Sequence, residues 1–72
     1  MCVYLDHVHL VCKNIEKLHA FAKKIGLKRC WFQNHKIPHY DLTTERKRQN
    51  AIKAGAKLVT TREIIRLFRS NN

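Results

Sequence analysis

The sequence predicts a small α/β domain, in which helices pack on one mixed sheet in the order β-α-β-β-α-β-α. One observation favours this class, and another indicates a single domain. Short extended segments alternate along the chain with segments whose apolar residues recur at helical spacing. No linker, repeat or low-complexity tract interrupts the 72 residues, so we expect one domain, 1–72, with a frayed tail at 69–72. A chain this short buries only about 60% of its unfolded surface, so marginal stability or self-association into a homo-oligomer is expected.

The first part of the chain predicts a strand followed by a helix. Residues 2–12 are rich in Val, Leu and Tyr, and they indicate one strand or two short strands broken near Asp6. Apolar residues on both faces of this segment favour a central place in a covered sheet. Asn14 is a suitable N-cap for a helix over 14–25, and Gly26 is its expected end.

The rest of the chain predicts a hairpin and two further helices. The elements are an extended segment over 27–33, a polar turn over 34–38, strands over 39–42 and 56–59, and helices over 44–54 and 61–70. Thr43 is placed to cap the first of these helices, and Gly55 is placed to end it. Thr60 and Glu63 match the capping-box pattern Thr-x-x-Glu, which marks the start of the last helix.

Charge is the most unusual property of the sequence. The chain has 15 Lys and Arg against 5 Asp and Glu, a formal net charge of +10. Such an excess favours polyanionic partners, with nucleic acid first and acidic protein surfaces next. The residues expected to bind nucleic acid are Arg46, Lys47, Arg48, Lys53, Arg62, Arg66, Arg69, Lys28 and Arg29. A solvated basic face that only aids solubility is the alternative.

The spacing of three of these arginines is informative. Arg62, Arg66 and Arg69 recur at helical spacing and are predicted to share one face of the last helix. The aromatic residues Trp31, Phe32 and Tyr40 could add base stacking on single strands, although the adjacent Trp31 and Phe32 could instead belong to the core. No recognised nucleic-acid motif accompanies them.

Four His and Asp residues are the candidate catalytic group: Asp6, His9, His39 and Asp41. On a strand, residues two apart point to the same face, so His39 and Asp41 project together. Imidazole nitrogen and carboxylate oxygen both ligate zinc and manganese, and Asp6, His39 and Asp41 are the predicted ligands of a divalent metal. Such an ion would activate water for phosphoryl transfer or hydrolysis. The alternative is structural: the histidines bond to backbone groups, and Asp41 caps the following helix.

Cysteine and histidine residues elsewhere carry weaker signals. Cys2, Cys12 and Cys30 are odd in number and lack metal-binding spacing, which indicates reduced thiols in a cytoplasmic protein. Cys30 could be a nucleophile activated by Arg29, although a buried thiol is the simpler expectation. His19 is expected to be partly buried and bonded to a backbone carbonyl. With no secretory signal and no apolar run near the roughly 20 residues that span a bilayer, a soluble protein without a membrane partner is expected.

Several motifs, taken in order, resemble a known family. VYLD opens the chain, HL precedes KLHAFAKKIGL, WFQ and HYDLT follow, and AIKAGAKLVTTRE comes last. Over most of its length the chain resembles the domain of unknown function 4031 family, short uncharacterised proteins of bacteria and phages. The resemblance implies a coherent fold and carries no established activity. Similar proteins have a longer segment after the first strand, where this chain passes from Asp6 to His9 within three residues.

The function predicted from these features is a small basic intracellular module that binds nucleic acid through its Lys and Arg surface. Two alternatives stay open. One is a metal-dependent hydrolase or nuclease that uses the His and Asp group. The other is a phage or bacterial interaction factor that binds an acidic partner surface.

Overall fold

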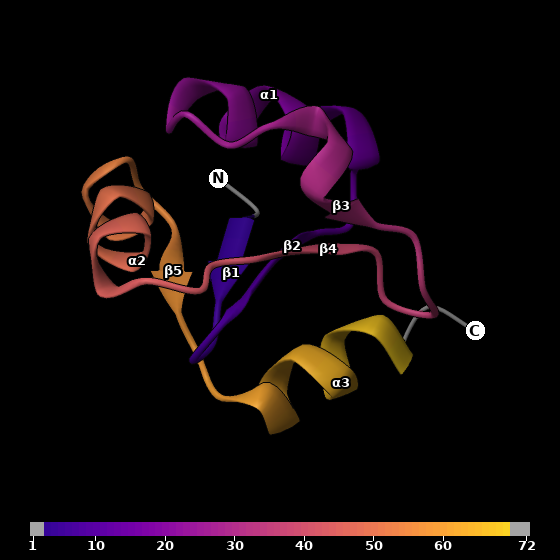
Figure 1. The fold of residues 1–72 in the computed structure, drawn as a ribbon. Coiled ribbons are helices and arrows are strands. Elements are labelled where there is room, and N and C mark those ends of the chain that lie inside the picture. The colour runs from indigo at the N-terminus through magenta and orange to yellow at the C-terminus, as the bar shows by residue number, and fades with distance from the viewer. Residues whose placement is uncertain (1–2, 70–72) are drawn as a thin grey trace.

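The structure is a computed structural model that describes residues 3–69, and its elements confirm the predicted α/β class (Figure 1). The strands are β1 (Val3–Leu5), β2 (His9–Cys12), β3 (Phe32–Gln33), β4 (His39–Asp41) and β5 (Lys57–Leu58). The helices are α1 (Ile15–Lys24), α2 (Glu45–Lys53) and α3 (Thr61–Arg69), with a 3-10 turn at Arg29–Trp31. Within residues 3–69, no helix is long and apolar enough to cross a membrane.

The five strands form one mixed sheet in the order β3-β4-β2-β1-β5. The chain does break near Asp6, so that β1 and β2 form an antiparallel hairpin in which Leu5 lies opposite Leu10. Strand β4 pairs antiparallel with β2 and with β3, whereas β5 runs parallel to β1 at the edge. The predicted hairpin between the residues before and after the polar turn is therefore confirmed as β3–β4.

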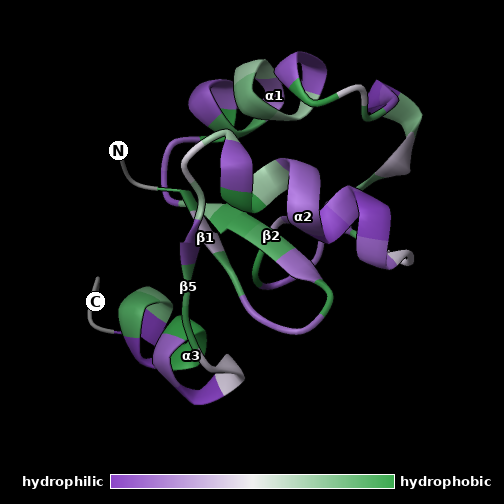
Figure 2. Cartoon of the chain, turned by 90° about the vertical axis from the view of Figure 1, so that its left-hand side faces the viewer, coloured by the Kyte–Doolittle hydropathy of each residue, from purple (hydrophilic) through white to green (hydrophobic). Residues whose placement is uncertain are grey.

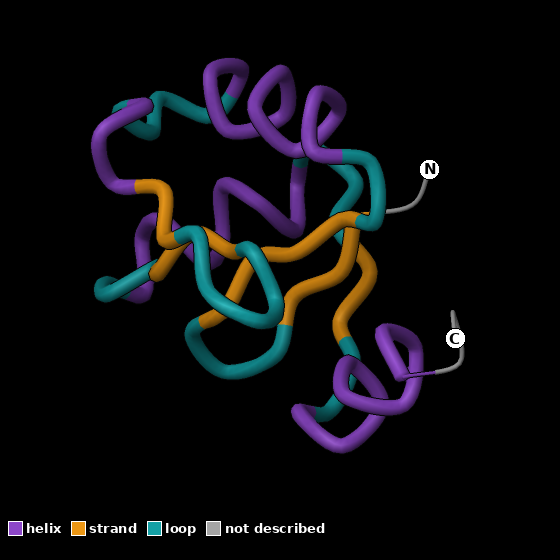
Figure 3. Tube along the Cα trace, turned by 90° about the vertical axis from the view of Figure 1, so that its right-hand side faces the viewer, coloured by secondary structure: helices purple, strands orange, loops and turns teal. Residues whose placement is uncertain are grey.

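Helices cover both faces of the sheet. Figures 1 and 3 show α1 and α2 on one side of the strands and α3 on the other. Side chains alternate along each strand, so Leu10 and Tyr40 join the core under α1, whereas Val11 faces α3. Figure 2 shows β1 and β2 as largely apolar ribbons between the helices, while α2 is mostly hydrophilic and buries only Ala51. The two faces of the sheet therefore have different roles, a core on one side and a pocket on the other.

The helix ends follow local sequence signals closely. Asn14 accepts a hydrogen bond from the Lys17 amide at 3.1 Å, as expected of an N-cap. The chain after α1 turns at Gly26, whose φ of +85° is the left-handed conformation that glycine adopts without strain. Thr60 and Glu63 form the predicted capping box, with the Glu63 amide 3.1 Å from the Thr60 hydroxyl and the Glu63 carboxylate 3.2 Å from the Thr60 amide.

Two predicted helix details are wrong by a small margin. The N-cap of α2 is Thr44, whose hydroxyl accepts from the Lys47 amide at 3.2 Å, and not Thr43. Asp41 is also not a cap. It lies within β4, and its carboxylate contacts His39 in the site described below. Arg69 of the expected tail 69–72 ends α3, and the rest of that tail lies outside the described residues.

The extended segment predicted over 27–33 is interrupted by the 3-10 turn. The Trp31 amide donates to the Lys28 carbonyl at 3.0 Å. A strand would direct Trp31 and Phe32 to opposite faces, whereas both rings pack against the core, which requires a bend between them. The bend leaves Cys30 exposed, so the expectation of a buried thiol there is wrong.

Candidate metal centre

The four predicted His and Asp residues come together on the face of the sheet covered by α3. His9 lies directly opposite Asp41 in the β2–β4 ladder. The Nε2 atom of His39 is 3.2 Å from Oδ1 of Asp41, and the Nε2 atom of His9 is 3.9 Å from the same oxygen. The two imidazole rings meet edge to face, with centroids 4.9 Å apart. The cluster thus depends on one strand pair that brings residues far apart in sequence together.

Asp6 is the buried anchor of this cluster, with 2% of its surface exposed. Its Oδ1 accepts from the Val8 and His9 amides at 2.8 and 2.7 Å. Its Oδ2 accepts from the Thr61 hydroxyl at 2.7 Å and lies 3.0 Å from Nδ1 of His9. Burial alone would raise the pKa of Asp6, but the hydrogen bonds from His9, Thr61 and Val8 outweigh it and hold the pKa at about 2. Asp6 is therefore a carboxylate whose two oxygens are already occupied.

This anchoring sets the orientation of His9. A carboxylate only accepts hydrogen bonds, so Nδ1 of His9 must carry the proton that faces Asp6. The lone pair of the neutral ring is then on Nε2, the atom nearer Asp41. In metal sites, a ligating histidine usually donates its other ring N–H to a carboxylate, which fixes the orientation of the ring.

His39 is held in the same way by a backbone group. Its Nδ1 lies 2.8 Å from the Ile37 carbonyl oxygen, which can only accept, so Nδ1 donates. Its Nε2 then faces the Asp41 carboxylate at 3.2 Å. A neutral ring has one proton for these two acceptors, so with Nδ1 donating to Ile37 the lone pair of Nε2 faces the carboxylate, as in the ligand pairs that hold a metal ion.

The donor set fits a divalent cation. His9, His39 and Asp41 each offer one ligand atom, and these atoms all lie within 4.8 Å of one another. Ligands about 2.0–2.1 Å from a tetrahedral metal are separated by roughly 3.3 Å, so these atoms would move together by at most about 1.5 Å to hold one ion. The side chains of His9 and Asp41 are 40% and 39% exposed, which leaves one side open for water or substrate. Two imidazoles and one carboxylate suit zinc, manganese or iron(II).

The ligand set differs in one member from the predicted one. Asp6, His39 and Asp41 were the expected ligands, but the atoms that converge belong to His9, His39 and Asp41. Asp6 instead orients His9, and sequence reasoning missed its partner Thr61, which comes from α3. In the sequence, the only indication that His9 is a ligand is its position three residues after Asp6.

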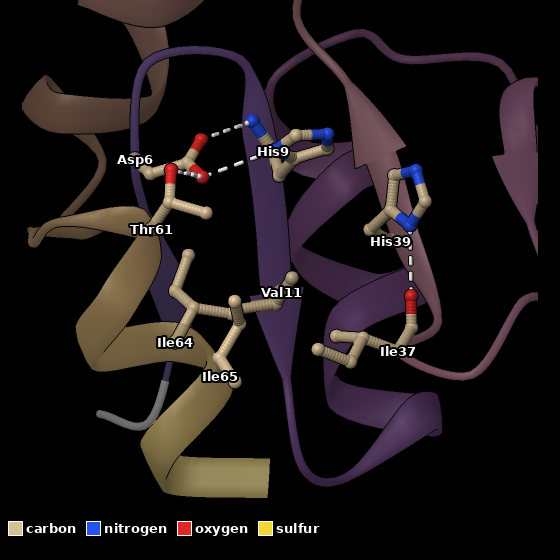
Figure 4. Close-up of a pocket in the computed structure, with 8 residues that line it drawn as sticks. All are labelled: Asp6, His9, Val11, Ile37, His39, Thr61, Ile64 and Ile65. Carbon is tan, nitrogen blue, oxygen red and sulfur yellow. Dashed lines mark hydrogen bonds and ion pairs between the residues drawn. The ribbon is translucent and has the colours of Figure 1, made fainter.

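A pocket of about 230 Å³ adjoins the cluster on the α3 side. Figure 4 shows Asp6, His9 and His39 along its upper edge, with apolar side chains from β2, from the turn before β4 and from α3 below them. Its lining residues are Asp6, His9, Val11, Ile37, His39, Thr61, Ile64 and Ile65. Polar ligand atoms beside an apolar wall are the usual composition of a small-molecule or substrate site.

The predicted nucleic-acid-binding residues are spread over two separate surfaces. On one surface, Lys28 and Lys47 lie 5.8 and 4.3 Å from the Trp31 ring centroid, and Arg29 lies 5.4 Å from that of Phe32. Arg46 and Lys53 of α2 are exposed, whereas Arg48 is half-buried and bonded to Glu45 at 2.9 Å. On the other surface, Arg62, Arg66 and Arg69 line one groove with Ile65.

The groove of α3 borders the pocket beside the His and Asp cluster. Ile65 lines both of them, so the arginine groove and the His and Asp cluster lie on the two sides of one side chain. Ile65 is 43% exposed, which makes it an apolar edge rather than a buried wall. Anions bound along Arg62, Arg66 and Arg69 would therefore lie next to the metal pocket.

Fold and site define a small α/β domain with a candidate metal centre on one face of its sheet. The chain belongs to the family described as "Protein of unknown function (DUF4031)", whose model matches residues 4–71. The resemblance seen in the sequence motifs is thereby confirmed. Searches of the curated proteins and of the solved structures return no match.

Proposed function

We propose that the protein is a divalent-metal-dependent hydrolase of phosphodiester bonds, with His9, His39 and Asp41 as the metal ligands. One observation carries the proposal. Both imidazoles already donate from Nδ1 to a fixed oxygen, and both direct Nε2 toward the same carboxylate oxygen of Asp41. This arrangement places three ligand atoms around one point and leaves the other positions of the ion open.

The chemistry follows from an ion with open positions. A divalent metal lowers the pKa of bound water and stabilises the charge that develops on a phosphoryl oxygen. Asp6 is a positioning residue here, because it holds the His9 ring rather than contacting substrate. The net charge of +10 and the groove of Arg62, Arg66 and Arg69 support a nucleic-acid strand as the phosphodiester substrate.

Cleavage assays with chelator-treated protein test the proposal. Labelled single-stranded and duplex oligonucleotides should be cleaved after Zn²⁺ or Mn²⁺ is added, and not in its absence. His39→Ala should reduce cleavage to the metal-free background, because it removes a ligand. His35→Ala is the matched control, since His35 is an exposed residue of the preceding turn and lies outside the ligand set. Metal binding without cleavage of any DNA or RNA substrate would reject the hydrolase function.

Nucleic-acid binding without catalysis is a second candidate, favoured by the three arginines that line one groove. Binding should weaken steeply with salt, with a slope of about one log unit for each phosphate contacted. Replacing Arg62, Arg66 and Arg69 with Gln should reduce the slope by about 3 units. The control with the same change of charge replaces the exposed Lys24, Lys36 and Lys57. Equal slopes for the two triple variants, measured by fluorescence titration, would show that the groove is not the site.

A cytoplasmic location is part of this proposal. Cys30 is an exposed free thiol, which is stable in a reducing compartment and prone to oxidation elsewhere.

A further inference from the structure

A second pocket, of about 490 Å³, lies on the opposite face of the sheet from the metal centre. Tyr40 belongs to the same strand as His39 and Asp41, but the alternation of side chains turns it toward α1. The pocket is lined by His19, Ala20, Lys23, Leu27, Arg29 and Tyr40. These lining residues include two cations, an imidazole and a phenol, but no carboxylate.

The contact between His19 and Tyr40 fixes the hydrogen-bonding state of the imidazole. The Tyr40 hydroxyl lies 2.7 Å from Nδ1 of His19, so the expected backbone carbonyl partner of His19 is wrong. Tyr40 is 1% exposed, and a buried hydroxyl must donate its proton to an acceptor. Nδ1 of His19 therefore accepts, and its Nε2 carries the proton of the neutral ring. Burial, and then the charge of Arg29, lower the pKa of His19, which keeps this neutral form populated.

The two cations of the pocket are not neutralised by the protein. Within residues 3–69, neither Lys23 nor Arg29 lies within 4.0 Å of a carboxylate oxygen. Arg29 instead rests over the Phe32 ring at 5.4 Å, and His19 meets the same ring edge to face at 4.6 Å. The Phe32 ring thus contacts both Arg29 and His19, while Lys23 adds an exposed charge from the last turn of α1.

We propose that this pocket binds a phosphate dianion through the guanidinium of Arg29, the ammonium of Lys23 and the Nε2 proton of His19. A phosphate dianion, as HPO4²⁻ or as a phosphomonoester, offers three unprotonated acceptor oxygens, which matches three donor groups and no competing acid. The planar guanidinium suits two phosphate oxygens at once, and the lysine adds a point charge. The site is independent of the metal centre, because the sheet separates them.

Titration of chelator-treated protein with inorganic phosphate tests the site, followed by NMR of ¹⁵N-labelled histidine at constant ionic strength. The Nε2 signal of His19 should move and saturate in the millimolar range. Arg29→Gln and Lys23→Gln should each weaken binding at least five-fold. Lys23 is exposed, so its replacement leaves the core intact even if Arg29→Gln disturbs the contact with Phe32. Lys57→Gln, with the same change of charge on β5, should bind phosphate like the unaltered protein.

Two results would overturn the site. One is a shift that grows linearly with phosphate and is equal in Lys23→Gln and Lys57→Gln, which means weak non-specific association of phosphate. The other is a His19 signal that does not move. An oligonucleotide with a 5′-phosphate, compared with the same oligonucleotide ending in a hydroxyl, identifies the source of the phosphate. Tighter binding of the phosphorylated form assigns the site to a nucleic-acid end, and equal binding of the two assigns it to small phosphate compounds.

Discussion

Adding Zn²⁺ or Mn²⁺ at about a hundred times its dissociation constant is expected to raise the free energy of unfolding by about 2.7 kcal/mol. The ion should bind the folded chain alone, because its ligands come from β2 and β4 and meet only when these strands pair. A domain of 72 residues gains roughly 4–8 °C in melting temperature per kcal/mol, so the increase should exceed 10 °C. Thermal melts of chelator-treated protein with and without metal measure it.

Variants of the ligands separate specific binding from a general effect of the ion. His39→Ala should abolish the increase, whereas His35→Ala should retain it, since His35 only stacks beside His39 with centroids 5.9 Å apart. Asp41→Asn should lose most of it, because an amide is a poor ligand for zinc. A metal-dependent increase that is the same in His39→Ala and Asp41→Asn as in the unaltered protein would contradict the assigned ligands.

Asp6→Asn is expected to lower the free energy of unfolding by about 3 kcal/mol. The carboxylate accepts from two amides, a hydroxyl and an imidazole, and all four partners are donors. An amide side chain puts an NH₂ group where one carboxylate oxygen was, so the Thr61 hydroxyl and the His9 ring must reverse their hydrogen-bonding roles, and the charge-assisted bonds are lost. Urea unfolding at low temperature measures the loss in a domain whose total stability is about 5 kcal/mol.

The same carboxylate predicts how stability depends on pH. The pKa of Asp6 is lowered from 3.8 to about 2 on folding, so its contribution is fully present above about pH 4 and is lost as pH falls toward 2. The loss should be about 2 kcal/mol, and it should be absent in Asp6→Asn. Thr61→Val, which removes one of the four donors, should cost only about 1 kcal/mol. An equal acid dependence in Asp6→Asn would show that other carboxylates are responsible.

Local signals predicted most of the fold because they act over a few residues. The Asn14 cap, the turn at Gly26 and the Thr60–Glu63 box depend on neighbours within four positions, and all three are present. The bend at residues 29–31 was missed because it depends on how Trp31 and Phe32 pack against the core. Tertiary packing decided the backbone there, against an extended local pattern.

The candidate site was predictable only in part, for the same reason. The alternation of a strand places His39 and Asp41 on one face, and this follows from two residues of sequence. The place of His9 depends on the register of β2 against β4, which no local pattern specifies. The bond between Thr61 and Asp6 joins residues 55 positions apart, and the bond between His19 and Tyr40 joins residues 21 apart. Both contacts exist only because separate elements meet across the sheet.

The attachment of α3 also has a consequence for the motions of the protein. Ile64 is the one fully buried residue described in this helix, and the Thr61 hydroxyl ties its first turn to Asp6. Few buried contacts mean a low free energy of local opening, so α3 can detach while the core under α1 and α2 stays folded. Detachment would remove Ile64 and Ile65, which form one wall of the pocket beside the His and Asp cluster, and would expose Val11 on the face of the sheet. We therefore expect the amide hydrogens of α3 to exchange faster than those of α1 and the central strands, and their exchange rate would measure how often this helix opens.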